Sequence, residues 1–175
     1  MQLIKPTPAY KEKALAYRKA HFDIGETEIQ GDNNLDVSKT YEEWLDYLDF
    51  VEAGKHEIYL PSSTYFAIID DEIVGIVDIR HRLNDALLKC GGHIGYSTHP
   101  QHRRKGYATQ ILRLALEKCK AMGIEKVLVT CNKENIGSQK TILNNGGVLE
   151  NEYTDEKGQV TLRHWLDATN GCGDS

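Results

Sequence analysis

Residues 93–112, HIGYSTHPQHRRKGYATQIL, are the most informative part of the chain. Its first part, His93–Thr98, is a run of strand-forming residues that stops before Pro100, which predicts a short strand. From about Lys105, apolar residues recur at i, i+3, i+4 and i+7 until Gly123, which predicts a helix with one apolar face. This order of strand, turn and amphipathic helix makes the turn the first candidate for a functional site.

The turn carries three basic side chains, Arg103, Arg104 and Lys105, followed by Gly106 and then by small Ala108. A helix start has unpaired N–H donors and a partial positive charge, so its amides can surround a phosphate where nothing bulky intrudes. The turn lacks both the Gly-x-Gly-x-x-Gly of a dinucleotide-binding turn and the Gly-Lys-Ser/Thr of a P-loop. We therefore expect a pyrophosphate site here; the alternative is a solvated basic turn.

The rest of the chain predicts short helices and strands, with a long acidic loop over residues 23–38. Thr40 and Glu43 form a capping-box pattern at one helix start. The expected helices span residues 9–21, 40–53 and 135–145, and the expected strands span 64–69, 73–79, 126–131, 148–153 and 160–166.

These elements predict the α+β class. We expect a central, mostly antiparallel twisted sheet that contains one parallel crossover and is flanked by about four helices. We expect one domain over residues 1–168, followed by a flexible tail over residues 169–175.

Composition narrows the classes of function. The formal net charge is −5, so the field of the whole molecule would repel nucleic acid. No stretch reaches the roughly 18 apolar residues of a membrane span, and the first residues lack the apolar run of a signal peptide. The cysteines have no CxxC spacing and are expected as free thiols: Cys90, Cys119, Cys131 and Cys172. We expect a cytoplasmic protein without a nucleic-acid, membrane or metal partner.

Two motifs carry a family resemblance. Residues 93–112 resemble motif A of the GNAT superfamily of N-acetyltransferases, and residues 131–148, CNKENIGSQKTILNNGGV, resemble its motif B. The runs GGHIGYS, RRKGYAT and NNGGVLENE look most like a bacterial subgroup of predicted acetyltransferases. The resemblance covers about residues 1–168 and implies a GNAT-like domain that uses acetyl-CoA as cosubstrate.

The resemblance also implies which residues hold coenzyme A. The basic turn would hold the pyrophosphate mostly through backbone amides, and the strand before it would pair with the pantetheine arm like an added strand. A strand amide would stabilise the thioester oxyanion. The implied cofactor-binding residues are Ser97, Thr98, Arg103, Arg104, Lys105, Gly106, Tyr107, Ala108, Thr109, Asn135 and Ser138.

The implied reaction is direct attack of an amine on acetyl-CoA. Many relatives carry a Tyr acid seven residues after the motif B Asn, but Ile142 occupies that place after Asn135. Ser138 or a water would then protonate the thiolate, unless Ser138 is an exposed bystander. His93 stands near the strand start, where relatives often carry a carboxylate base, and a histidine can do the same work near neutral pH. The alternative is that His93 is a satisfied strand residue facing away from the cleft.

Two acidic segments, residues 23–36 and 150–156, flank the place where this fold usually forms its acceptor pocket. They favour a cationic primary amine on a small molecule or peptide, because negative potential would concentrate it; solvated surface carboxylates are the alternative. The rival function is a non-catalytic acyl-CoA sensor that kept the cofactor cleft. The terminal hairpin makes a homodimer plausible.

Overall fold

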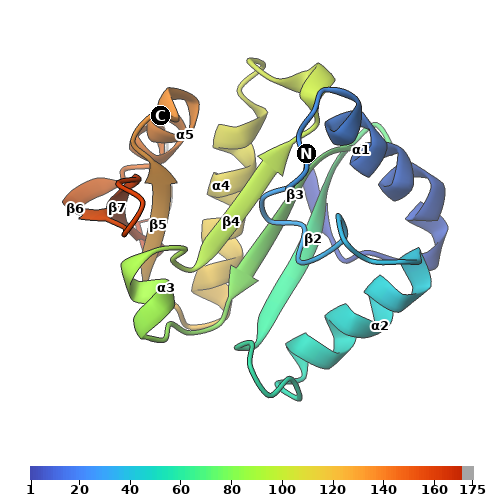
Figure 1. Cartoon of the computed structure of the whole chain (residues 1–175), viewed down its shortest axis with the longest axis horizontal. Helices are drawn as coiled ribbons and strands as arrows, with labels where there is room; N and C mark the ends of the chain where they lie inside the picture. The colour runs from blue at the N-terminus through green and yellow to red at the C-terminus, as the bar shows by residue number, and fades with distance from the viewer. Residues whose placement is uncertain (171–175) are drawn as a thin grey trace.

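The computed structural model describes residues 1–170, which form seven strands and five α-helices (Figure 1). The strands are β1 (Gln2–Ile4), β2 (Ser62–Ile69), β3 (Glu72–Arg80), β4 (Ile94–Thr98), β5 (Lys126–Asn132), β6 (Val148–Thr154) and β7 (Val160–Asp167). The helices are α1 (Lys11–Asp23), α2 (Tyr41–Glu52), α3 (Asp85–Lys89), α4 (Tyr107–Ala121) and α5 (Ile136–Asn144). Short 3-10 helices, Pro8–Tyr10 and Pro100–His102, precede α1 and α4. The predicted α+β class is confirmed.

The sequence did not predict two of these elements. β1 has three residues, which is too short to show an alternating pattern. α3 has five residues, and its start is marked by Asn84, whose Oδ1 accepts a hydrogen bond from Leu87 N at 2.9 Å. With α3 included, the described residues hold one α-helix more than the four expected.

The strands form two antiparallel sheets, in the orders β1-β2-β3-β4 and β5-β7-β6. The predicted central sheet is thus divided at its parallel crossover, where β4 and β5 run in the same direction on either side of α4 (Figure 1). Where β4 begins, His93 N donates to Leu128 O at 2.8 Å and so links the two sheets. Both β4 and β5 are therefore edge strands, and their edges face each other.

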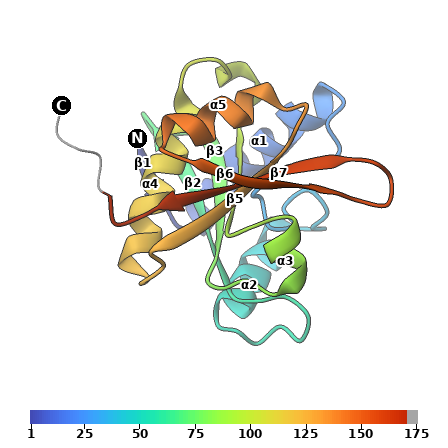
Figure 2. The same cartoon turned by 90° about the vertical axis from the view of Figure 1, so that its left-hand side faces the viewer.

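Each face of the first sheet has its own core. On one face, Val77 of β3 packs in a buried cluster with Ile111 of α4. On the other face, Ile76 packs in a cluster with Trp44 of α2 and Tyr17 of α1. Because consecutive strand residues point to opposite faces, β3 separates these two cores. Figure 2 shows the same layers from the side, with the β6–β7 hairpin projecting beyond them.

The loop between α1 and α2 lies directly on β4. A Cβ built on Gly31 would stand 2.4 Å from the carbonyl oxygen of Gly95, so no side chain fits between them. Gly31 also has a φ of 76°, which favours glycine. The indole nitrogen of Trp44, on α2, donates to the carbonyl oxygens of Asp32 and Asn33, at 3.1 and 3.0 Å. These bonds hold the same loop against α2.

Most of the predicted tail, residues 169–175, lies outside the described residues. The domain limit at residue 168 therefore stays a prediction. Within residues 1–170, no helix is both long and apolar enough to cross a membrane.

Candidate active site

The basic turn places an open helix start beside the end of β4. Gly106 is the N-cap residue of α4, with a φ of 77°, and Arg104 also has a positive φ of 63°. A Cβ on Gly106 would meet nothing within 4 Å, so the space in front of the turn is open. The N-cap position makes no side-chain hydrogen bond to the first turn of α4. The amides of that turn can therefore meet an external acceptor.

Three other helices lack this feature because their starts are capped. Thr40 caps α2, Asn84 caps α3 and Asn135 caps α5, in each case through a side-chain oxygen that accepts a backbone N–H. A capping side chain uses one of the free donors at a helix start. α1 also begins without a side-chain cap, at Tyr10, so α4 is distinguished by its missing cap together with its basic residues, its glycine and the open space in front of it.

Arg103 is held by the loop between α1 and α2. Its Nη1 and Nη2 donate to the two carboxylate oxygens of Glu26, at 2.7 and 2.9 Å. Glu26 Oε2 also lies 2.6 Å from Nδ1 of His21. The bonds from Arg103 lower the pKa of Glu26 to about 2, so this carboxylate is charged at neutral pH. The side chains of Arg104 and Lys105 are exposed, and they remain the charged candidates for phosphate contact.

The main chain of β4 alternates between β3 and the open edge. His99 N donates to Val74 O of β3 at 2.8 Å, and in a strand residues two apart direct their main-chain groups to the same side. The N–H and C=O of Ser97 therefore face β3, whereas those of Tyr96 and Thr98 face the open edge. The main chain of Ser97 is therefore already paired with β3, contrary to the prediction, whereas the role of Thr98 stays a prediction.

Two tyrosine–serine contacts flank β4 on opposite faces. Tyr96 Oη lies 2.8 Å from Ser138 Oγ of α5, on the face toward α4 and α5. Tyr17 Oη of α1 lies 2.8 Å from Ser97 Oγ, on the other face. Tyr96 is not among the site residues predicted from the sequence. The sequence signal for this contact is the alternation of side chains along the strand. Ser97 points to one face of β4, so the preceding Tyr96 points to the other face, toward α5.

The predicted motif B residues lie at the start of α5. Asn135 Oδ1 accepts from Ser138 N at 3.0 Å, so the cap uses the carbonyl oxygen and leaves the side-chain NH2 group. Ile142 is fully buried among the core residues and has no group that could donate a proton. Ser138, one turn earlier, is half-buried beside Tyr96.

His93 joins the start of β4 to β5 through two hydrogen bonds. We call this hydrogen-bonded end of the β4–β5 junction its closed end. Its Nδ1 accepts a hydrogen bond from Leu128 N at 2.9 Å, while its own N–H donates to Leu128 O. Burial, aided by the charge of Arg80, lowers the pKa of His93 to about 4, so the ring is neutral. Nε2 then carries the proton, and no lone pair is left to take one from a substrate. This contact corrects the prediction of His93 as a base.

Two acidic groups of β6 are already paired with cations. Glu150 Oε2 accepts from Arg163 and from the indole of Trp165, at 2.6 and 2.8 Å. Glu152 pairs with Lys133 at 2.8 Å. The negative potential expected of the β6–β7 hairpin is therefore weaker than a count of its carboxylates suggests.

One buried carboxyl that the sequence did not single out is Asp78 of β3. It is 5% exposed, it pairs in register with Gly95, and it accepts a hydrogen bond from Thr64 Oγ1 at 2.9 Å. Burial raises the pKa of Asp78 to about 6.

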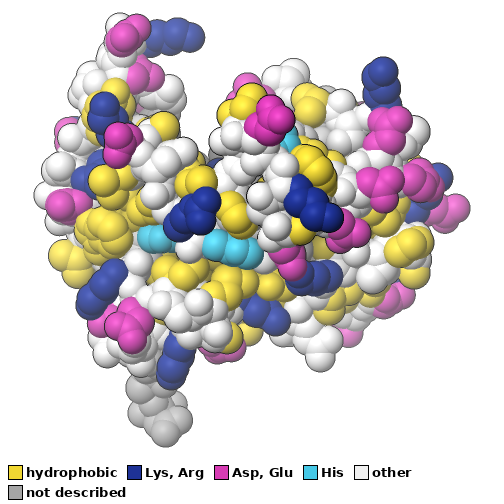
Figure 3. Space-filling model, turned by 90° about the horizontal axis from the view of Figure 1, so that it is seen from below, with side chains coloured by type: hydrophobic (Ala, Val, Ile, Leu, Met, Phe, Trp, Pro, Cys, Tyr) yellow, Lys and Arg dark blue, Asp and Glu magenta, His cyan; other side chains and the backbone are white. Residues whose placement is uncertain are grey.

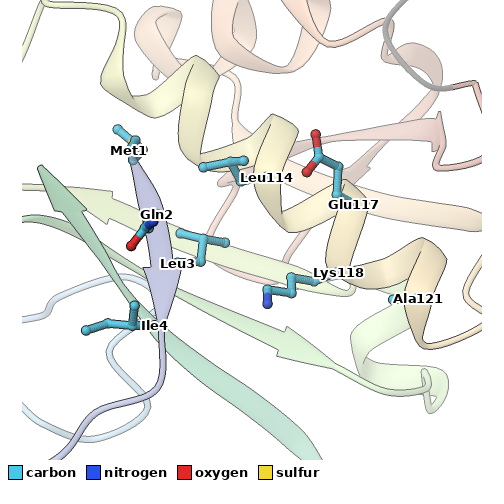
Figure 4. A pocket seen from close by; sticks show the side chains of 8 residues that line it. All are labelled: Met1, Gln2, Leu3, Ile4, Leu114, Glu117, Lys118 and Ala121. Carbon is cyan, nitrogen blue, oxygen red and sulfur yellow. The ribbon is translucent and has the colours of Figure 1, made fainter.

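Two hollows are present on the described surface. One, of about 430 Å³, lies between β1 and α4 and is lined by Leu3, Leu114 and Lys118 among others (Figure 4); it holds none of the predicted site residues. The other, of about 300 Å³, lies between residues 132–134 and the hairpin residues 157–160. Figure 3 shows a deep notch between a projecting arm and the body of the molecule.

These features together define an α+β acyltransferase domain. The Acetyltransferase (GNAT) family model matches residues 29–144, and the chain belongs to this family. The family uses acetyl-CoA, and among residues 1–170 no group of three or more His, Cys, Asp or Glu side chains is placed to hold a metal ion.

A curated relative is the uncharacterized N-acetyltransferase YjdG of Bacillus subtilis (strain 168). It is 31% identical over 80 residues, which make up 43% of this chain and 42% of the relative. The match thus spans about two fifths of the relative's length.

Solved structures share the fold at low sequence identity. A mutant of spermidine N-acetyltransferase SpeG from Vibrio cholerae has a TM-score of 0.65 and 13% identity, covering 99% of this chain and 98% of that one. RimL, a ribosomal alpha-N-protein acetyltransferase in complex with coenzyme A, has a TM-score of 0.69 and 14% identity, covering 95% and 94%. The microcin self-immunity acetyltransferase MccE, in complex with acetyl-CoA and AMP, has a TM-score of 0.64 and 15% identity, covering 94% and 91%.

Proposed function

We propose that this chain transfers an acetyl group from acetyl-CoA to a primary amine of a small molecule or peptide, by direct attack in a ternary complex. The observation that carries the proposal is the uncapped start of α4 beside the open edge of β4. A diphosphate at the turn and an amide-containing arm along the edge would pair main-chain groups at both places.

The pyrophosphate would lie on the first turn of α4. Its acceptors would be met by the amides of Tyr107, Ala108 and Thr109, with the exposed side chains of Arg104 and Lys105 adding charge. The helix dipole contributes about 0.3 to 1 kcal/mol per anion at such a site. Arg103 would act here through its main chain, because its guanidinium is bound to Glu26.

The pantetheine arm would run along β4 from the turn toward Tyr96. The main-chain groups of Thr98 and Tyr96 face this edge and would pair with the arm's amides. The side-chain NH2 of Asn135 would donate to a pantetheine carbonyl, because its Oδ1 already caps α5. Ser138 would then lie beside the sulfur.

The attacking amine must arrive neutral and leave its proton to water, because His93 has no free lone pair. The amide of Tyr96, at the open edge, would stabilise the oxyanion of the tetrahedral intermediate. Alignment of the two reactants would supply much of the acceleration, since it can remove roughly 7 to 11 kcal/mol of barrier.

The acceptor class we propose is a cationic amine. Its support is the acidic loop between α1 and α2, in which Glu28 is exposed and Asp36 is half-buried. The paired carboxylates of the hairpin argue for a modest effect. Steady-state rates with polyamines, aminoglycosides, amino acids and Lys peptides test the proposal, and a preference for an anionic amine would contradict it.

The turn is tested by two matched substitutions at the two ends of α4. Gly106 and Gly123 both have positive φ, 77° and 81°, and both have open space where a Cβ would be. Asp tolerates this conformation better than most residues, so Gly106→Asp and Gly123→Asp make the same charge change at similar backbone cost. We expect Gly106→Asp to raise the Kd for coenzyme A about tenfold, equal to about 1.4 kcal/mol. Gly123→Asp should leave this Kd unchanged.

Isothermal titration with coenzyme A measures both variants, and equal Kd values would contradict the placement of the pyrophosphate. Release of free thiol from acetyl-CoA in the presence of the amine panel then tests transfer itself. Ile142, buried where the resemblance implies an acid, is the observation that favours the sensor as a second candidate. Binding without thiol release from any amine would favour it.

We also propose that the domain extends over residues 1–168 and functions in the cytoplasm, where free thiols such as Cys119 and Cys131 stay reduced. A homodimer is a further proposal. β6 is the outer strand of its sheet and exposes Val148 and Leu149. Sedimentation of the full chain would test this, and a monomer at all concentrations would contradict it.

A further inference from the structure

The proposed transfer has a second proton requirement that the residues discussed so far do not meet. When the C–S bond of the thioester breaks, the sulfur leaves as a thiolate and needs a proton. Under the proposed function, this sulfur lies where β4, β5 and α5 meet. The groups there that could donate a proton are the hydroxyls of Tyr96, Ser138 and the buried Thr141 and the thiol of Cys131.

Tyr96 is the best donor among these groups. Its main chain faces the open edge, and its side chain crosses to α5, where Oη lies 2.8 Å from Ser138 Oγ. Burial raises the pKa of Tyr96 to about 12, so the phenol keeps its proton at neutral pH. Burial also raises the pKa of the Cys131 thiol nearby. The pKa of a coenzyme A thiol would be raised in the same surroundings, which favours protonation of its thiolate.

We propose that Tyr96 is a catalytic residue: its hydroxyl protonates the departing thiolate of coenzyme A, and Ser138 passes a replacement proton from solvent. The C–S bond breaks with its electron pair on sulfur, which takes the proton of Tyr96 Oη. The phenolate takes the proton of Ser138 Oγ, which recovers one from water. The amine nitrogen loses one proton to water, so the step yields an amide and a free thiol with no net gain or loss of protons.

Other polar groups around β4 do not fit this role. Tyr17 has the same contact distance to a serine, 2.8 Å to Ser97 Oγ, but it lies on the opposite face of the strand. His93 is bound at the closed end of the junction, with Nδ1 accepting from Leu128 N. A β4 tyrosine would thus supply the donor that the buried Ile142 cannot.

The test compares Tyr96→Phe with Tyr17→Phe, because each removes one tyrosine hydroxyl that contacts a serine at the same distance. We expect Tyr96→Phe to lower kcat about 100-fold, as loss of a general acid does. Its Kd for acetyl-CoA should stay within about threefold of wild type, because the main chain that pairs with the arm is unchanged. Tyr17→Phe should lower thermal stability and leave kcat within about threefold.

Ser138→Ala separates the relay from a purely structural contact. We expect a smaller fall in kcat, about tenfold, because water can replace the serine hydroxyl but not the phenol. The proposal is overturned if Tyr96→Phe keeps wild-type kcat, or if Tyr17→Phe loses as much. It is also overturned if the fall in kcat only follows a loss of acetyl-CoA binding. These results differ from failure of the proposed function, in which the wild-type chain itself releases no thiol with any amine.

Discussion

The two ends of the junction between β4 and β5 are built differently. At the closed end, His93 joins the strands through two bonds to the main chain of Leu128, one from its ring and one from its backbone. At the open end, the strands have separated, and the contact is between the side chains of Tyr96 and Ser138. A substrate arm can displace water from the open end, but at the closed end it would have to break buried backbone bonds.

The difference shows that chemical type alone does not reveal which end of a strand is functional. A histidine is the more familiar proton carrier, yet its lone pair is committed to Leu128. A tyrosine is the more familiar core residue, yet it borders the open edge. What distinguishes His93 from Tyr96 is its place relative to the open edge of β4. This place follows from how β4 pairs with its neighbours.

The largest effect is expected when the closed end is broken. His93→Ala would leave the buried N–H of Leu128 without an acceptor, and we expect the free energy of unfolding to fall by about 3 kcal/mol. Urea denaturation measures the change. In His93→Asn, the side-chain Oδ1 can take the place of Nδ1, so we expect a loss of less than about 1 kcal/mol.

The same two variants also separate a structural role of His93 from a catalytic one. If His93→Asn is stable and retains its acetyl-transfer rate, the imidazole ring serves only to hold β5 against β4. If it is stable but inactive, the predicted base role is restored. A His93→Ala variant as stable as wild type would show that this contact contributes little.

The next effect concerns Asp78, which pairs with Gly95 between the two ends. Burial raises its folded pKa to about 6, above the ordinary value of 3.8, so the folded state holds the proton more tightly than the unfolded state. The contribution of Asp78 to stability therefore falls as pH rises from about 4 to 6, by about 2 to 3 kcal/mol, and stays lower above that range; His93, whose pKa burial lowers to about 4, contributes in the opposite direction over the same range.

Asp78→Asn keeps an oxygen to accept from Thr64 and removes the titration. We expect this variant to be more stable than wild type at pH 8, and we expect the difference to shrink as pH falls from about 6 to 4, measured by urea denaturation at several pH values. Comparison of the two proteins cancels the contributions of the other titrating groups, among them His93 and Asp32. A stability difference that does not change between pH 4 and 6 would contradict the prediction.

The smallest effect is expected when the ion pair between Glu26 and Arg103, near the open end, is removed. Glu26→Gln removes the charge that binds Arg103, and both side chains are partly exposed, 35% and 42%. We expect a loss of about 0.5 to 1 kcal/mol, since partly exposed ion pairs contribute little. Thermal melting in low and high salt measures it: the difference from wild type should shrink as salt screens the pair. A salt-independent difference would show that the lost contact is steric.

The sequence was sufficient for the elements with long patterns or explicit end signals. Thr40 does accept from Glu43 N at 3.1 Å, as the capping box predicts, and the turn before α4 has the glycine and open space expected of it. These features depend on residues close in the chain, where spacing determines contact.

Features that depend on pairing between distant segments could not be predicted. The direction of the main chain at Ser97, the lone-pair use of His93 and the contact of Tyr96 with Ser138 all follow from the register of β4 and the separation of β5. β1, with three residues, is a strand because β2 offers it an edge. No local pattern carries this information.

The contact between Gly31 and Gly95 restricts how this domain could be re-engineered. A replacement segment between α1 and α2, brought in from another protein to change substrate preference, would need glycine at position 31, because a methyl group there would stand 2.4 Å from the carbonyl oxygen of Gly95. Transplants that match the loop length but not this residue should therefore push the segment off β4. Libraries that fix Gly31 and vary the surrounding residues would avoid this failure.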